Sequence, residues 1–163
     1  MTLTKKEKQK RERQKIEKMI KREESVSGKA VSFVISYEHS QGRECVDMQT
    51  KKGFKGFDVL SFSEGKEDEK EIRAIEVKGT ESKDNKIPDL FETEVSRSGK
   101  LVATHLYLVV FGKGKKEDPT KLYIIPAKEF KTDDFSETRH YTIKSNFYTR
   151  NNKLKKFEAK VYV

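Results

Sequence analysis

Three charged side chains within "GFDVLSFSEGKEDEKEIRAIEVKGT", residues 56–80, have the types and the spacing for chemistry on a phosphate group. Glu76 and Lys78 lie two residues apart in an apolar run, so on a β-strand they share one face, with Cα atoms about 6–7 Å apart. Asp58 begins the preceding apolar run, and antiparallel pairing of the two runs would place it opposite them. A buried carboxylate is costly unless something pairs with it, so these residues need an explanation.

Two converging carboxylates form a hard oxygen site that suits Mg²⁺ or Mn²⁺ rather than zinc. Such a metal would polarise a scissile phosphate and lower the pKa of its bound water. Lys78 could then orient the attacking water or stabilise the negative charge developing on the phosphate. The alternative is a solvent-facing hairpin with an ion pair between Glu76 and Lys78, because Asp followed at a distance by Glu-x-Lys also arises by chance in lysine-rich chains.

Strands and helices must position these residues. Residues 57–62 and 71–80 read as two strands around a polar spacer, and the second strand is apolar on both faces, as is typical of a central strand covered by helices. Further strands are expected at 105–112 and 121–127. The whole order, α, β, β, α, β, β, predicts an α/β fold with a mixed sheet flanked by helices.

A helix is predicted over residues 29–42, "KAVSFVISYEHSQG", ending at Gly42. Glu38 lies on its apolar side, so we expect this carboxylate to point into the protein and reach the metal directly or through a water molecule. Residues 90–102 predict the start of another helix, capped by Thr93, and residues 43–56 read as a loop. The end of the chain, 139–163, reads as a strand, an Asn-rich turn and a terminal strand.

Charge points to a polyanionic partner. The chain of 163 residues has a net charge of +9, and residues 1–29 alone contain 11 Lys or Arg against 5 Glu. This surplus favours nucleic acid, although a solubilising surface would look the same. The basic N-terminal stretch predicts a helix that is either an arm on DNA or solvent-exposed. Near Asp58, the basic residues alternate with Phe54 and Phe57 and could follow a backbone or stack a base; they are Lys51, Lys52 and Lys55.

Composition also excludes several classes. Cys45 is the only cysteine, so neither a disulfide nor a cysteine-based metal site can form within one chain. The three histidines are scattered without metal-ligand spacing. No apolar run approaches the ~20 residues of a membrane span, and no apolar leader follows the N-terminus. We therefore expect a soluble, cytoplasmic protein without a membrane partner.

The chain also resembles a known family. The elements that carry the resemblance are the helix ending in "YEHSQGRE", the "GFDV" strand, "IEVKGT" and the following "LYLVV" strand, within about residues 29–128. Together they are similar to the NO VEIN C-terminal domain, a branch of the PD-(D/E)XK nuclease superfamily that is often attached to helicases and bacterial defence proteins. The resemblance implies a restriction-endonuclease-like fold and Mg²⁺-dependent (or Mn²⁺-dependent) cleavage of nucleic acid, with DNA the expected substrate.

The resemblance also implies roles for individual residues. Glu38 matches the helical glutamate, Asp58 and Glu76 the acidic metal ligands, and Lys78 the motif lysine; Thr80 follows where similar domains have a small polar residue near the nucleic acid. The implied organisation is a basic helical arm, 1–28, before a nuclease-like domain, 29–163. A helicase or ATPase acting in trans and a second copy of the chain are the partners expected besides DNA.

Three hypotheses therefore remain open from the sequence. The first is a metal-dependent endonuclease in restriction, defence or DNA processing. The second is a catalytically silent nuclease fold that binds nucleic acid or a helicase-type partner. The third is a basic ribosome- or RNA-associated protein in which Glu-Val-Lys occurs by chance.

Overall fold

The computed structural model describes residues 5–63, 71–81, 83–91, 93–96, 99–112, 118–137 and 141–161. Its α-helices are α1 (Lys5–Glu24), α2 (Val26–Ser40) and α3 (Ser145–Arg150), with short 3₁₀ turns η1 (Met48–Thr50), η3 (Ala127–Glu129), η4 (Thr132–Asp134) and η5 (Asn152–Phe157). Its strands are β1 (Arg43–Asp47), β2 (Val59–Ser63), β3 (Ile72–Thr80), β4 (His105–Phe111), β5 (Pro119–Pro126), β6 (Phe135–Glu137), β7 (Tyr141–Ile143) and β8 (Glu158–Ala159).

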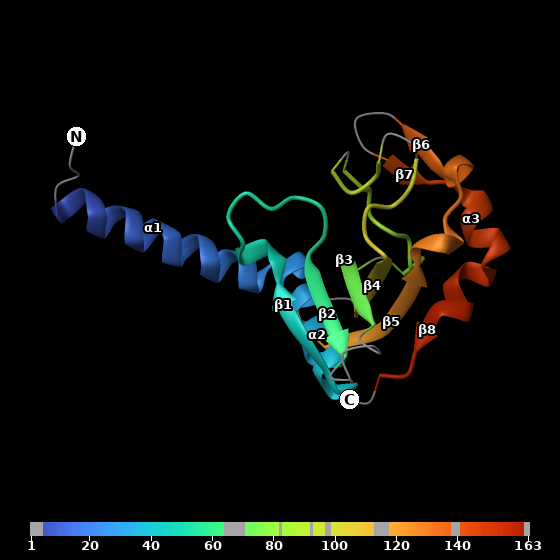
Figure 1. Ribbon diagram of the computed structural model, residues 1–163, viewed down its shortest axis with the longest axis horizontal. Coiled ribbons are helices and arrows are strands. Elements are labelled where there is room, and N and C mark those ends of the chain that lie inside the picture. Colours follow the sequence, from blue (N-terminus) through green and yellow to red (C-terminus); the bar gives the residue numbers. More distant parts are fainter. Residues whose placement is uncertain are drawn as a thin grey trace.

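A six-stranded sheet organises the chain, in the order β1-β2-β3-β4-β5-β8. β3 and β4 run parallel, and every other neighbouring pair in this sheet is antiparallel. The predicted α/β fold with a mixed sheet flanked by helices is confirmed, and it is consistent with a restriction-endonuclease-like architecture. The sheet, α2 beside it and the C-terminal elements on its far flank are visible in Figure 1.

Each face of this sheet has its own apolar core. On one face, Ala30, Val31 and Val34 of α2 pack against Ile75 and Val77 of β3. The other face is covered by the segment that joins β3 to β4 and by the C-terminal elements; this larger cluster includes Leu90, Val95, Leu108, Tyr123, Phe147 and Leu154. Because successive side chains on a strand point to opposite faces, Glu76 and Lys78 lie on this second face, away from α2.

α2 can approach β3 closely because of one glycine. A Cβ atom at Gly79 would lie 2.9 Å from the carbonyl oxygen of Val26 and 3.0 Å from the Cβ of Ala30. Any larger residue would therefore push the helix from the sheet. The helix begins at Ser25, whose Oγ accepts a hydrogen bond of 3.0 Å from the backbone N–H of Gly28.

Three predicted segments are corrected by the structure. Residues 43–47, expected within a loop, form the edge strand β1. The expected helix over 90–102 is absent from its described residues, where isolated bridges join Leu90 to Tyr141 and Val95 to Leu101. Near the C-terminus, α3 and η5 replace part of the expected strand-turn-strand pattern, because Phe147, Leu154 and Phe157 recur at a spacing that buries them against the sheet.

The basic N-terminal helix is confirmed as α1, which projects from the rest of the molecule (Figure 1). Ile16 and Ile20 are about half exposed, at 51% and 49%. Most of the helix is therefore solvated. Among the described residues, no helix is both long enough and apolar enough to cross a membrane.

Candidate active site

The structure brings Asp58, Glu76 and Lys78 together on the face of the sheet that α2 does not cover. β2 pairs antiparallel with β3, and the backbone N–H of Asp58 donates to the carbonyl of Ile75 over 2.9 Å. This register sets Asp58 opposite Glu76, as the sequence predicted. The alternative of a solvent-facing pair does not fit, since Glu76 is only 3% exposed and the side chain of Lys78 11%.

Asp58 is held from two sides. Its Oδ2 accepts a hydrogen bond of 2.8 Å from the backbone N–H of Val77, and its Oδ1 accepts one of 2.6 Å from the amide of Gln49. Burial raises the pKa of Asp58 above its ordinary value, and these hydrogen bonds and the charge of Lys78 oppose that rise. The carboxylate is therefore fixed in orientation by the sheet backbone.

Glu76 is the most perturbed carboxyl of the cluster. Burial, followed by the negative charge of Asp58, raises the pKa of Glu76 to about 9, although Lys78 acts in the opposite direction. Its Oε1 lies 3.1 Å from Nζ of Lys78. One positive charge thus has to balance several crowded carboxyl groups, and such imbalance is common in functional sites.

Lys78 also contacts a fourth residue that the sequence reading missed. Its Nζ lies 2.9 Å and 2.8 Å from the two carboxylate oxygens of Glu94, and 5.3 Å from the centre of the Phe91 ring. Burial alone would lower the pKa of Lys78, but Glu76 and Glu94 outweigh it and raise the pKa. Lys78 is therefore an ammonium, and it can donate hydrogen bonds but cannot act as a base near neutral pH.

Glu94 reaches the cluster through the fold rather than through a motif. It lies in the segment between β3 and β4, where its Oε2 also accepts a hydrogen bond of 2.8 Å from the backbone N–H of Phe91. Burial of Leu90 and Val95 on either side fixes that segment over the sheet. Glu94 is not part of a short sequence motif with Glu76 and Lys78. The only sign of its position in the sequence is the pair of apolar residues near it, Leu90 and Val95, which indicate that this segment packs on the sheet.

Glu38 does not join this cluster, and the expectation that it reaches the metal is corrected. It is fully buried, as its helical position predicted, but it lies on the α2 face of the sheet. The side chain of Arg73 points to the opposite face of β3 from that of Glu76, and its Nη1 lies 3.4 Å from Oε1 of Glu38. The sheet therefore separates Glu38 from Glu76 and Lys78.

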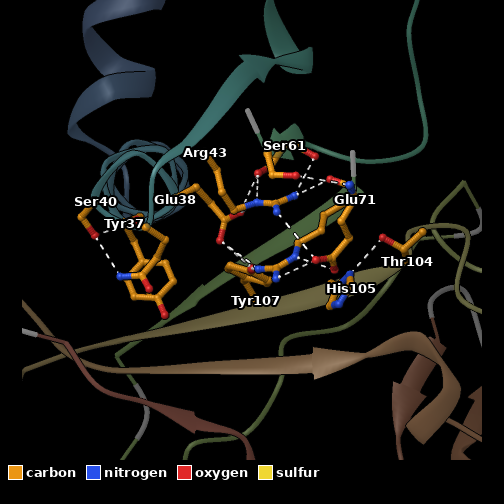
Figure 2. A network of polar contacts seen from close by, with 12 residues as sticks. Tyr37, Glu38, Ser40, Arg43, Ser61, Glu71, Thr104, His105 and Tyr107 are labelled. Atoms are coloured by element: carbon orange, nitrogen blue, oxygen red, sulfur yellow. Dashed lines mark hydrogen bonds and ion pairs between the residues drawn. The ribbon is translucent and has the colours of Figure 1, made fainter. Parts of the chain in front are cut away.

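Glu38 instead forms the centre of a polar network that joins α2 to four strands, β1 to β4 (Figure 2). Its Oε2 accepts hydrogen bonds from Nε of Arg43, at 2.9 Å, and from the hydroxyl of Ser61. Its Oε1 accepts one from the hydroxyl of Tyr107, at 2.7 Å, and burial next to Glu38 raises the pKa of that tyrosine. A carboxylate with this many donors is fully satisfied and is not open to a ligand.

The residues predicted to contact nucleic acid divide into two sets. Lys51, Lys52 and Lys55 are exposed on the loop that leads to Asp58, and the base of this loop is closed by a hydrogen bond of 2.8 Å from the N–H of Met48 to the carbonyl of Asp58. Thr80 is almost buried, at 9%, at the end of β3. It lies on the same face as Lys78 but offers little surface to a ligand.

The same loop carries two phenylalanines with different roles. Phe57 packs against the larger core, whereas Phe54 is 39% exposed, with the two rings in edge contact at 4.8 Å. Phe91 beside Lys78 is 50% exposed. Exposed aromatic rings and lysines therefore lie near the charged cluster.

The donor set is compatible with magnesium but small. No group of three or more His, Cys, Asp or Glu side chains is arranged to hold a metal within the described residues. Magnesium, however, is commonly held by one or two carboxylates, with water and substrate phosphates completing its coordination. Asp58 and Glu76 meet that need in number, because they lie opposite each other on one face of the sheet; the negative charge of Asp58 also raises the pKa of Glu76.

Comparison with known proteins matches the chain to a family model. The family model described as "Protein NO VEIN, C-terminal" matches residues 26–125, which include α2, the two-stranded unit carrying Asp58, Glu76 and Lys78, and β4 and most of β5. No curated protein and no solved structure matches the chain.

Proposed function

This chain belongs to the NO VEIN C-terminal family, and from that membership and its buried charged cluster we propose that it is a metal-dependent nuclease of the PD-(D/E)XK type. The observation that carries the proposal is the set of Asp58, Glu76 and Lys78 on one sheet face, with the pKa of Glu76 raised to about 9 and Lys78 protonated. Strong perturbation of adjacent groups is typical of catalytic sites.

Each residue has a defined part in the proposed reaction. Asp58 and Glu76 would hold Mg²⁺ or Mn²⁺, which when bound polarises the scissile phosphate and acidifies a water molecule. Lys78 donates hydrogen bonds to a non-bridging phosphate oxygen and stabilises its growing negative charge. Glu94 keeps the ammonium of Lys78 in position through contacts of 2.8 and 2.9 Å.

Nucleic acid is the proposed substrate because of the surface near this cluster. Lys51, Lys52 and Lys55 are exposed on the loop before Asp58 and would contact backbone phosphates. Phe54 in the same loop has the exposure needed to stack on a base. We propose DNA rather than RNA as the substrate, by analogy with the superfamily.

The experiment is cleavage of labelled single- and double-stranded DNA and RNA in Mg²⁺, Mn²⁺ or EDTA, by the native chain and by Lys78→Ala and Asp58→Ala. Metal-dependent cutting that both variants lose is the expected result. It would identify the polymer at the same time.

A second candidate is a nuclease fold that binds nucleic acid or a helicase-type partner without cutting. The small number of metal-ligating groups among the described residues favours it. Tight, salt-sensitive binding retained in both variants, with no cutting under any metal, would support this candidate and contradict the first.

The biological setting completes the proposal. We assign the chain to restriction, defence or DNA processing in the cytoplasm, with a helicase or ATPase acting in trans and a second copy of the chain as partners. The basic helix within residues 1–28 would be an arm attached to the nuclease-like domain of residues 29–163. These assignments rest on the family and on the charge of the chain.

A further inference from the structure

A groove of about 870 Å³ lies away from the charged cluster, between the segment that follows β3 and the C-terminal elements. Residues 83–89 form one wall, and residues from β7, α3 and η5 form the other. Tyr123 of β5 lies at its base. Neither Asp58 nor Lys78 lines it, so it is a separate feature.

The walls of the groove are positively charged. Five lysines are among its described lining residues: Lys83, Lys86, Lys121, Lys153 and Lys155. Two aspartates also line it, and one of them, Asp89, already accepts a hydrogen bond of 2.9 Å from the hydroxyl of Thr142. The lysine side chains are exposed; Lys83 and Lys86 come from one wall, Lys153 and Lys155 from the other, and Lys121 from β5. A ligand in the groove would therefore meet cations on both sides.

Unusual backbone conformations collect at the same groove. Four non-glycine residues in the described part of the chain have positive φ angles, and three of them line it: Asn85 (51°), Asn152 (49°) and Lys153 (52°). The fourth, Leu154 at 70°, is fully buried in the core below. Consecutive left-handed residues are unfavourable for L-amino acids and persist where packing imposes them, often at ligand sites.

Two tyrosine hydroxyls hold the first wall, one to the base of the groove and one to the opposite wall. Asn85 donates a hydrogen bond of 3.0 Å to the hydroxyl of Tyr123, and the backbone N–H of Ile87 donates one of 2.9 Å to the hydroxyl of Tyr148. These bonds join the β3–β4 segment to β5 and α3. The spacing between the two rows of lysines is thus set before any ligand arrives, which lowers the entropic cost of binding.

The groove and the charged cluster share one face of the sheet. Lys78 pairs with Leu108, and Leu108 pairs with Tyr123, so the base of the groove lies two strands from Lys78. At about 4.8 Å for each strand spacing, that is about 10 Å across the sheet. A polymer lying in the groove is therefore within a short reach of the cluster.

We propose that this groove binds the phosphate backbone of a nucleic-acid strand and so anchors the substrate beside the charged cluster. The choice of nucleic acid as ligand rests on the proposed function. The lysines provide cations that release condensed counterions from phosphates, and this gives binding without sequence preference.

The experiment measures binding of labelled single- and double-stranded DNA in EDTA across a salt series. The test variant combines Lys86→Gln, Lys153→Asn and Lys155→Gln, with asparagine chosen at 153 because it tolerates a positive φ. The control variant, Lys128→Gln with Lys131→Gln, removes exposed lysines that do not line the groove. Thermal melting of both variants checks that the fold is kept.

The expected result is weaker binding by the groove variant, with a slope of log affinity against log salt that falls by about 1 for each lysine lost. The control should keep the native affinity and slope. Equal affinity and slope in the groove variant and native chain would overturn the proposal, as would an absence of DNA binding by the native chain. Displacement by a mononucleotide as readily as by the polymer would also overturn it.

These outcomes are distinct from failure of the proposed function. Groove-dependent binding without metal-dependent cutting would retain the groove and reject the nuclease. Metal-dependent cutting together with binding that does not depend on the groove would retain the nuclease and reject the groove.

Discussion

Glu38 and Glu76 are both buried glutamates in the centre of the molecule, yet their surroundings differ in kind. Glu38 is fully buried and accepts hydrogen bonds from Arg43, Ser61 and Tyr107, so its charge is compensated on every side. Glu76 is 3% exposed and has Lys78 as a cationic neighbour, while Asp58 adds negative charge. Burial is thus shared, but Glu38 is surrounded by hydrogen-bond donors, whereas Glu76 has one cationic neighbour beside other carboxyl groups.

The difference shows how a carboxylate that stabilises the fold can be distinguished from one that could take part in a reaction. A carboxylate with several hydrogen-bond donors ties elements together, as Glu38 ties α2 to the sheet. A crowded one has a raised pKa and is stabilised by a further cation. Substitution of Glu38 should therefore lower the stability of the fold, whereas substitution of Glu76 should lower the cleavage rate and leave the fold intact.

The largest expected effect is loss of cleavage in Glu76→Gln. The substitution removes a proposed metal ligand, so the cleavage rate should fall on the order of 10³- to 10⁴-fold, at the upper end of single catalytic groups. Folding should be unharmed, because a crowded carboxyl is replaced by a neutral group of the same shape. Single-turnover cleavage and thermal melting are the measurements, with Glu158→Gln as an exposed control. Native-like cleavage by Glu76→Gln would contradict the assignment.

The next effect is on stability and concerns Glu38→Ala. Loss of this carboxylate leaves Arg43, only 7% exposed, without its buried partner, and breaking such a pair costs about 3–5 kcal/mol of unfolding free energy. Urea unfolding measures it. The matched control is Glu71→Ala, whose side chain is 58% exposed beside Arg73 and should cost less than about 1 kcal/mol. A Glu38→Ala variant with native stability but no cleavage would return Glu38 to the active site.

The same contrast explains how far the sequence alone could lead. Periodicity identified both buried glutamates as inward-facing, and strand alternation placed Asp58 opposite Glu76. Local spacing could not tell which face of the sheet α2 would cover, and that choice separates Glu38 from the other residues. The close approach at Gly79 that fixes this packing is a tertiary property.

Two other failures have related causes. β1, "RECVD", is a short edge strand whose charged residues mask its pattern, although Arg43 turned out to be a buried partner of Glu38. Glu94 lies 16 residues from Lys78, and their contact depends on how the β3–β4 segment folds over the sheet. Contacts of this range are set by the buried residues of the segment, Leu90 and Val95, and not by a motif.

A smaller, pH-dependent effect follows from the raised pKa of Glu76. Its protonated form is favoured in the folded state, so its contribution to stability is complete below its ordinary pKa of 4.5 and is lost as the pH rises toward about 9. Binding of Mg²⁺ must displace that proton, so the apparent affinity should rise with pH, by up to about tenfold per unit between pH 7 and 9. The shift of melting temperature with Mg²⁺ at each pH measures this. Asp58→Asn should abolish the shift, and a pH-independent shift would contradict a site at Glu76.

The smallest expected effect comes from Glu94→Gln. This variant tests whether Glu94 stabilises the fold, as Glu38 does, or takes part in the reaction, as proposed for Glu76. The glutamine keeps an oxygen for the N–H of Phe91, so the segment should stay folded. It removes one of the charges that raise the pKa of Lys78, so this pKa should fall, as followed by NMR titration of Nζ. Cleavage should change by less than about tenfold, with the basic limb of its pH profile moving to lower pH. An unchanged Lys78 titration would make Glu94 a latch for its own segment, whereas a loss as large as that of Glu76→Gln would make it a metal ligand.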